Sequence, residues 1–186
     1  MAGETALSAF TAGRLVEVEL LGGVGQREID LVEHDPAWAA RFDTERRRIV
    51  GVLGDGVRVE HVGSTAVPGL VAKPIVDIQV SVPDVSEETS YVPGLVAAGY
   101  ELRVRERGHR MLRTPERDVH VHVCDAGGEW EHRHLAFRDR LRSSPTDRDR
   151  YAAVKSSLAA QGWSSMNAYA AAKTDVIAEI MDRRRQ

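Results

Sequence analysis

Two runs of alternating apolar and polar residues, 57–62 and 75–82, lie on either side of a short polar loop. A period of two residues is typical of β-strands, because successive side chains point to opposite faces of a sheet. Gly63 and Ser64 end the first run, and in the second run apolar residues surround Asp77. The pattern therefore predicts a strand, a loop and a second strand that carries one inward carboxylate.

The rest of the chain predicts further strands and several helices. Three alternating segments predict strands at 100–105, 109–114 and 118–124, and a short strand is expected at 29–33 after an alternating segment at 15–21. Helical spacing and capping residues predict helices at 35–53, 83–98, 129–143, 146–160 and 165–183, with a break at Pro93. This order favours an α/β (α+β) fold with a C-terminal helical segment.

Length and charge narrow the class of protein. A chain of 186 residues with a formal net charge of −3 suits one domain and has no global attraction for nucleic acid or an anionic membrane. Arginines are dense between Glu101 and Arg117, which is typical of a solvated hairpin face. No aromatic residues alternate with them, as a surface for single-stranded nucleic acid would require. We therefore expect no nucleic-acid partner.

Cysteine usage and hydropathy indicate a cytosolic protein. Cys124 is the only cysteine, so no internal disulfide is expected and a reducing compartment is favoured. No apolar run approaches the roughly 18 residues that cross a bilayer. The first 27 residues lack the charged start and apolar middle of a secretory signal. We expect a cytoplasmic protein that does not bind a membrane.

The loop between the first two strands has the composition of a phosphate-binding loop. Gly63 and Ser64 let backbone N–H groups approach an anion closely, and Thr65 and Lys73 add donors suited to a phosphate. Asp77 follows, where it would hold a metal ion beside that phosphate. The same Gly-Ser and Pro-Gly pairs are also typical of an ordinary turn, so the loop alone leaves both interpretations open.

Two histidines share one face of a later strand. His120 and His122 are two positions apart, while the valines between and beside them point to the other face. If this strand lies beside the strand of Asp77, the three side chains form a set of two imidazoles and one carboxylate that leaves room for water or substrate. The alternative is that the histidines hydrogen-bond across a polar sheet face without a metal ion.

Several linked motifs resemble a known family. The Gly-Ser loop followed by an Asp-containing strand resembles the signature of the nucleotidyltransferase superfamily, and more closely that of the GrpB family. The resemblance covers roughly residue 29 to the C-terminus. Its matching segments are Asp35–Trp38, His61–Gly69, Lys73–Val80, Val119–Val123 and His134–Asp139.

The resemblance implies a nucleotidyltransferase-like palm, in which a mixed, mostly antiparallel sheet carries flanking helices. It also implies one domain at 28–186, preceded by an arm or added edge strand at 1–27. The chain departs from the superfamily at Gln79, which takes the place of a second aspartate, and at the histidine strand, where a third acid would stand. Nucleotidyl transfer normally uses two metal ions held by several carboxylates, so we expect one ion here.

From the loop, the strands and the resemblance we assign candidate roles. Asp77, Lys73 and Arg110 are the candidate catalytic residues; Arg110 is preferred over Arg113 from the family's His-Arg-x-x-Arg segment, because alternation does not decide which of the two faces inward. Asp77, His120 and His122 are the candidate metal ligands. The candidate ligand-binding or phosphate-binding residues are His61, Gly63, Ser64, Thr65, Gln79, His134 and Arg138. For His61, His134 and Arg138, a structural role is the alternative.

The expected function is metal-dependent nucleotidyl or related group transfer with a small phosphate-bearing or nucleotide ligand. The expected cofactor is a divalent ion, Mg²⁺ or Mn²⁺, with Zn²⁺, iron or Ni²⁺ as alternatives because of the histidines. Two other functions remain open: a catalytically silent nucleotide-binding or folding-accessory module, and a His/Asp metal site that acts on a non-nucleotide anion.

Overall fold

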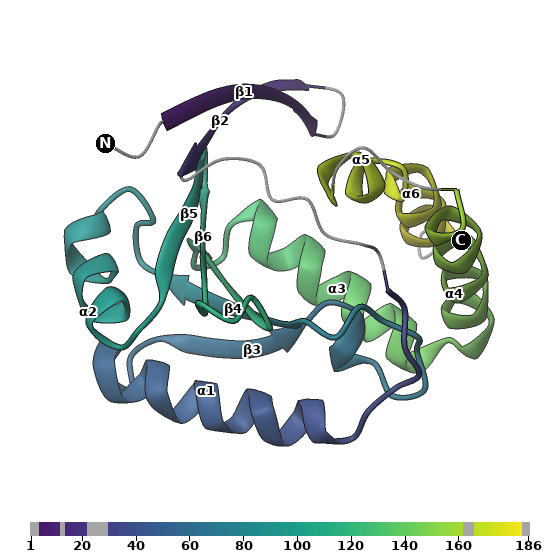
Figure 1. Ribbon diagram of the computed structural model, residues 1–186, viewed down its shortest axis with the longest axis horizontal. Helices are drawn as coiled ribbons and strands as arrows, with labels where there is room; N and C mark the ends of the chain where they lie inside the picture. The colour runs from purple at the N-terminus through teal and green to yellow at the C-terminus, as the bar shows by residue number, and fades with distance from the viewer. Residues whose placement is uncertain (1–3, 12–13, 22–29, 162–165, 184–186) are drawn as a thin grey trace.

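A seven-stranded mixed sheet forms the centre of the protein (Figure 1). The computed structural model describes residues 4–11, 14–21, 30–161 and 166–183. The spatial order of the strands is β1-β2-β5-β6-β7-β4-β3. Their bounds are β1 Glu4–Thr11, β2 Arg14–Leu21, β3 Arg58–Val62, β4 Val76–Val82, β5 Glu101–Glu106, β6 His109–Arg113 and β7 Val119–Asp125. β4 and β7 pair in parallel, and the other neighbours pair antiparallel.

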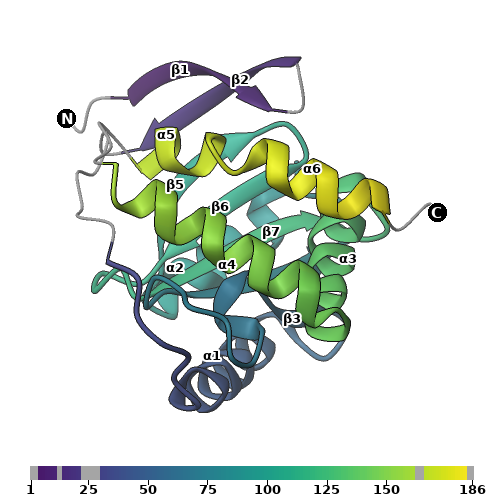
Figure 2. The same ribbon diagram turned by 90° about the vertical axis from the view of Figure 1, so that its right-hand side faces the viewer.

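Helices cover both faces of this sheet. α1 and α2 lie on one face, and α3 lies on the other (Figure 1). The two helices α4 and α6 pack against α3 at the C-terminal end of the chain (Figure 2). The helices are α1 Ala37–Leu53, η1 Ser64–Ala66, η2 Glu88–Ser90, α2 Val92–Ala97, α3 Glu129–Ser143, α4 Pro145–Ala159, α5 Met166–Ala171 and α6 Thr174–Asp182. No helix of the described part is long and apolar enough to cross a membrane.

Successive side chains of β4 and β7 point to opposite faces of the sheet, so core residues and polar residues lie on different faces. The valines and isoleucine of these strands are buried in one cluster with Trp38 and Ile49 of α1 and Leu95 of α2. The alternate residues point to the opposite face, toward α3; they are Asp77, Gln79, Ser81, His120, His122 and Cys124. The main core therefore lies on the side of α1, and the polar groups gather on the side of α3.

A second buried cluster holds the segment after β3 against the C-terminal helices. Val67 and Leu70 pack with Leu141 of α3, Tyr151 of α4 and Ile180 of α6. The Nε of Arg142 donates a hydrogen bond of 2.9 Å to the carbonyl oxygen of Ala66. The loop after β3 is thus fixed to helices that lie more than seventy positions later in the chain.

The expected α/β architecture, with its mixed and mostly antiparallel sheet, is confirmed, and some element boundaries differ. The segment 83–98 is divided into η2 and α2, and Pro93 lies in the first turn of α2, which proline fits, rather than at the break. The expected helix at 165–183 is divided into α5 and α6, with Ser165 outside the described residues. Of the expected strand at 29–33, a single bridge between Val32 and Ala72 is described, and Ile29 lies outside the described residues.

The N-terminal residues extend the sheet. The expected strand at 15–21 is β2, and β1, which the pattern did not predict, pairs with it. β2 in turn pairs with β5, so this hairpin forms one end of the sheet. The division of the chain at residues 27 and 28 into an added segment and one domain stays a prediction.

Candidate metal centre and anion pocket

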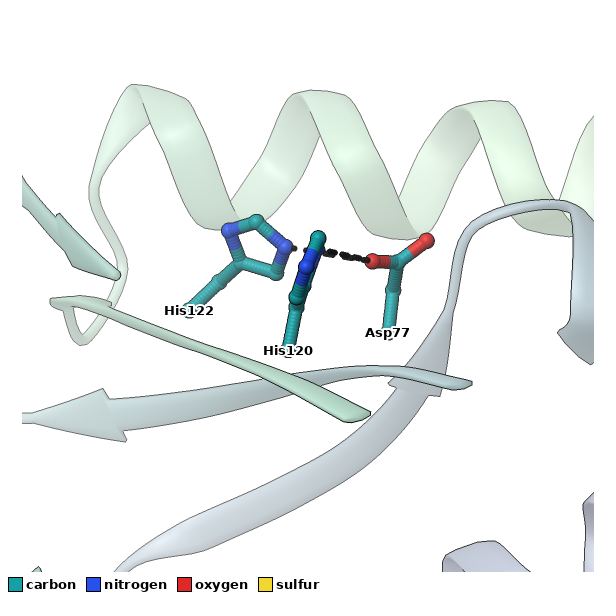
Figure 3. A group of neighbouring side chains, drawn as sticks. All are labelled: Asp77, His120 and His122. Carbon is teal, nitrogen blue, oxygen red and sulfur yellow. Dashed lines mark hydrogen bonds and ion pairs between the residues drawn. The ribbon is translucent and has the colours of Figure 1, made fainter. Parts of the chain in front are cut away.

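Asp77, His120 and His122 form a possible metal site (Figure 3). The Oδ1 atom of Asp77 lies 3.5 Å from Nδ1 of His120 and 3.4 Å from Nε2 of His122. One ligand atom from each residue lies within 4.8 Å of the others. The three side chains rise from the same face of the sheet and are partly exposed. They provide two imidazoles and one carboxylate, a set that suits a transition-metal ion with open positions for water or substrate.

The register of two parallel strands brings these residues together. In the pairing of β4 with β7, Asp77 lies opposite His120 and Gln79 lies opposite His122. Paired residues point to the same side of a sheet. The prediction that the histidine strand lies beside the strand of Asp77, with both sets of polar groups on one face, is therefore confirmed.

The Asp77 side chain is held as a carboxylate. Burial favours its neutral form, but hydrogen bonds from His120 and His122 outweigh burial and hold the pKa of Asp77 well below its usual range. A metal ligand must be deprotonated, so this group is ready to bind an ion at neutral pH.

A chain of hydrogen bonds runs behind His122. His109 of β6 contacts Glu106 through Nδ1 at 2.6 Å and His122 through Nε2 at 2.9 Å. Burial lowers the pKa of His109 to about 4, although Glu106 opposes the shift, so the ring is neutral at pH 7. Because a carboxylate only accepts hydrogen bonds, the single proton of His109 lies on Nδ1, and its Nε2 accepts the Nδ1 proton of His122. The Nδ1 proton of His122 is thus directed to His109, and its Nε2 atom is the one that faces Asp77, where it would bind a metal ion after losing its proton.

Aromatic rings stack against His109, the central member of this series of hydrogen bonds. The indole of Trp130 lies between two imidazoles, with its centroid 4.6 Å from that of His109 and 3.5 Å from that of His134. The two ring pairs are almost parallel, at 7° and 16°. The stack restricts rotation of the His109 ring, which in turn fixes the orientation of His122.

Gly63 allows the loop to approach Asp77. Its φ angle of +71° lies in the left-handed region, which glycine adopts without steric cost. A Cβ atom at this position would clash with Oδ2 of Asp77. Glycine is therefore required here both by the backbone conformation and by the closeness of the carboxylate.

A pocket of about 120 Å³ opens beside this site. Asp77 and His120 belong to both the candidate metal group and the pocket wall. The full lining is Leu31, Ser64, Thr65, Lys73, Ile75, Asp77, His120, Lys155, Tyr169 and Lys173. The structure thus brings five of the residues predicted from the sequence to one cavity: Ser64, Thr65, Lys73, Asp77 and His120.

His61 supports the loop from beneath. Its Nε2 atom lies 3.0 Å from Oγ1 of Thr65, and its ring stacks on Phe42 with centroids 4.9 Å apart. Burial lowers the pKa of His61 to about 4, so the ring is neutral at pH 7. His61 is not part of the pocket lining. Its contact orients the hydroxyl of Thr65, a residue that does line the pocket.

Arg110 lies on the other side of the sheet. It pairs with Val123 in the register of β6 and β7, so its side chain leaves the sheet on the face of the main core. Its Nε donates to Glu88 at 2.5 Å, and its Nη1 donates to the carbonyl oxygens of Glu106 and His109. Arg113, in contrast, pairs with His120 and shares its face. The structure therefore does not bring Arg110 to the pocket.

His134, Arg138 and Gln79 also lie outside the pocket lining. The Nδ1 of His134 donates to the carbonyl oxygen of Trp130 at 2.8 Å, and burial lowers the pKa of His134 to about 3. Arg138 donates to Glu60 and to the carbonyl oxygen of His61, which ties α3 to β3. Gln79 is fully buried, and its amide has no hydrogen-bond partner among the described residues. Ligand contacts of these three residues stay predictions.

Four residues of this region were not predicted from the sequence: Glu106, His109, Lys155 and Lys173. A hairpin pairing of β6 with β7 would have identified His109, because its face is fixed by that register. Lys155 reaches Ser64 across 91 positions, which no local pattern reveals. The scarcity of lysine was the available signal, since the chain has three lysines and 22 arginines.

Comparison with known proteins identifies the family. The family model described as GrpB protein matches residues 28–183. A UPF0157 protein of Streptomyces coelicolor is 54% identical over 166 residues, covering 89% of each chain. The crystal structure of conserved protein GrpB from Enterococcus faecalis is similar with a TM-score of 0.70 and 32% identity, covering 84% of this chain and 100% of that chain. A dephospho-CoA kinase of Mycolicibacterium paratuberculosis is 29% identical over 180 residues, which cover 81% of this chain and 44% of the kinase. The chain belongs to the GrpB family.

Proposed function

We propose that this protein catalyses metal-dependent nucleotidyl or related group transfer on a small phosphate-bearing ligand, on a nucleotidyltransferase-like palm. One observation carries the proposal: Asp77 and His120 are at once candidate metal ligands and walls of the pocket that Ser64, Thr65 and Lys73 also line. An ion bound by the first group would therefore face a ligand bound by the second. The similarity to a dephospho-CoA kinase supports a ligand of nucleotide type.

The donor set fits one divalent ion. Two imidazoles and one carboxylate suit Mn²⁺, Fe²⁺, Ni²⁺ or Zn²⁺ better than Mg²⁺, which prefers oxygen ligands. Glu106 and His109 direct the Nδ1 proton of His122 away from the site, so Nε2 is the atom that is available to an ion on the side of Asp77. When bound, such an ion polarises a phosphoryl oxygen and stabilises the negative charge that develops during transfer.

The side chains of the pocket perform the remaining tasks. The hydroxyls of Ser64 and Thr65 hydrogen-bond the phosphate and orient it, and the contact between His61 and Thr65 holds one of them in place. Lys73 neutralises charge on the phosphate. Gly63 keeps this loop in contact with Asp77, so that phosphate and ion are held next to each other.

Calorimetry and metal analysis test the proposal. The metal-free protein is titrated with Mg²⁺, Mn²⁺, Ni²⁺ and Zn²⁺, and then with ATP, GTP, CTP and UTP in the presence of the ion that binds. We expect one equivalent of metal and a nucleotide-dependent heat, both lost in Asp77→Ala and retained in the control Asp55→Ala, which changes an exposed turn. Absence of metal binding, or of any nucleotide response with every ion, would overturn the proposal.

A catalytically silent module is the second candidate, and two observations favour it. The candidate metal group holds a single carboxylate, and the residue in place of a second one is the buried Gln79. In addition, the chain matches less than half of the dephospho-CoA kinase, as an accessory segment would. Nucleotide binding without transfer of labelled nucleotide to any acceptor would support this candidate. Turnover that Asp77→Ala abolishes would reject it.

A further inference from the structure

All three lysines of the chain line the same pocket. Lysine occurs at positions 73, 155 and 173, whereas arginine occurs 22 times, so arginine supplies nearly all of the positive charge of the chain. Lys73 precedes β4, Lys155 belongs to α4, and Lys173 directly precedes α6. Three separate segments therefore each contribute one ammonium group to a single cavity. A compact ammonium fits a small cavity that a planar guanidinium would fill.

Lys155 is buried, and the part of the chain that the structure describes gives it no acidic partner. Its side chain is 2% exposed, and its Nζ donates to Oγ of Ser64 at 3.0 Å and to the carbonyl oxygen of Val71. The described ion pairs include neither Lys155 nor Lys173. Lys173 and Lys73 lie over the same ring of Tyr169, with Nζ at 4.6 Å and 5.0 Å from its centroid. The aromatic ring receives two cations but supplies no net negative charge.

The electrostatics of the pocket favour an incoming anion. Burial, together with repulsion from the other two lysines, lowers the pKa of Lys155 to about 7. Burial and repulsion from Lys73 lower the pKa of Lys173 to about 8, and Asp77 opposes this shift. Buried charges are normally paired, because an unpaired one is costly to remove from water. A bound anion would supply the negative charge that the described side chains around Lys155 lack.

Size and charge define the ligand group. The pocket of about 120 Å³ is well below the roughly 300–1,000 Å³ of sites that enclose drug-sized ligands. It accommodates a tetrahedral oxyanion, and a nucleoside would extend outside it. We propose that Lys73, Lys155 and Lys173 form a subsite for a tetrahedral dianion, the terminal phosphate group of a phosphomonoester or polyphosphate. The identity of the whole ligand rests on the proposed function, whereas binding of the anion itself does not require the metal ion.

Lysine-selective NMR tests the subsite directly. Protein labelled with ¹³C at lysine Cε gives three lysine signals, one for each wall of the pocket. We expect inorganic phosphate and sulfate to shift all three signals saturably in metal-free protein, and chloride at equal ionic strength to leave them unchanged. Shifts that do not saturate, or that chloride reproduces, would overturn the proposal.

Two substitutions assign the binding to this pocket. Lys155→Met and Lys173→Met should each weaken phosphate binding at least tenfold, while Arg148→Met removes a positive charge from α4 outside the pocket and should leave it unchanged. Equal affinity in Arg148→Met and Lys173→Met would reject the assignment. If Lys155→Met fails to fold, Lys173→Met and the wild-type titration still decide. Saturable phosphate binding without any metal or nucleotide response would keep the subsite and reject the proposed function, and the reverse result would reject the subsite alone.

Discussion

The two faces of β4 and β7 are built from alternate residues of the same strands, yet they differ completely in chemistry. Toward α1 the side chains are apolar and buried, as in Ile78 and Val121, up to Asp125 at the end of β7. Toward α3 the same strands present Asp77, His120 and His122, which are partly exposed. The face toward α1 supplies the free energy of burial, and the opposite face is free to carry groups that would destabilise a core. Stability and chemistry are thus separated by a shift of one residue.

The largest expected effect is a loss of stability from a substitution on the apolar face. Ile78→Ala removes a fully buried side chain at the centre of the main core and should lower the free energy of unfolding by about 2–5 kcal/mol. Urea denaturation measures this loss. Metal affinity of the folded variant should fall much less than stability, because the Ile78 side chain points away from the candidate metal group. A loss of stability below about 1 kcal/mol would contradict the assignment of this face.

A substitution on the polar face should have the opposite effect, with a large loss of metal affinity and a smaller loss of stability. His122→Ala removes one of three candidate metal ligands and should weaken metal binding by about 100-fold or more, beyond the range known for outer-shell changes. Its unfolding free energy should fall by less than that of Ile78→Ala. Competition with a chromophoric chelator measures the affinity, and His132→Ala, an exposed histidine of α3, is the control. Equal metal affinity in the two histidine variants would remove His122 from the site.

A smaller loss of metal affinity is expected from a change at Glu106, which contacts the candidate ligand His122 through His109. Glu106→Gln can donate a hydrogen bond to Nδ1 of His109, which would reverse the tautomers of His109 and His122. Metal affinity should then fall by about 10-fold to 100-fold, as for other outer-shell partners. Glu101→Gln on the same strand β5 pairs with Arg113 and is the matched control. If the two glutamate variants bind metal equally, the hydrogen bonds from Glu106 through His109 have no role in positioning His122.

The smallest effect concerns pH and the lysine pocket. Lys155 and Lys173, with pKa values of about 7 and 8, are ammonium groups at pH 6.5 and largely neutral amines at pH 9. Sulfate stays a dianion over this range, so its affinity should fall about tenfold as pH rises, because the two neutral amines still donate hydrogen bonds but no longer carry charge. Lys173→Met should reduce the dependence of sulfate affinity on pH. A wild-type sulfate affinity that does not change between pH 6.5 and 9 would contradict the prediction. The other titratable groups of the lining are Lys73, Asp77, His120 and Tyr169.

The central strands and the candidate metal group could be predicted from the sequence. Alternation around Asp77 and around His120 gave both strands and their polar faces, since period two is a local property. Their adjacency needed the family resemblance, because parallel pairing joins strands that are far apart in the chain. The register confirms that adjacency.

Other features depended on tertiary packing and could not be predicted. The position of Lys155 beside Ser64 follows from the way α4 packs on the loop after β3, which is set by buried residues such as Tyr151 and Val67. The face of Arg110 depends on the register between β6 and β7, and its own strand alternates too weakly to reveal it. In both cases the deciding contacts are non-local.

The parallel pairing of β4 with β7 has a consequence for how an ion is taken up. The three candidate metal ligands are up to 45 positions apart in the chain and meet only when the crossover between β4 and β7 has folded. The unfolded chain therefore does not hold all three close together. The strands themselves are held in register by the valines and isoleucine on the reverse side. An ion bound at this candidate site would therefore be loaded and released by the folded protein, and a chelator should remove it while the circular dichroism spectrum stays the same.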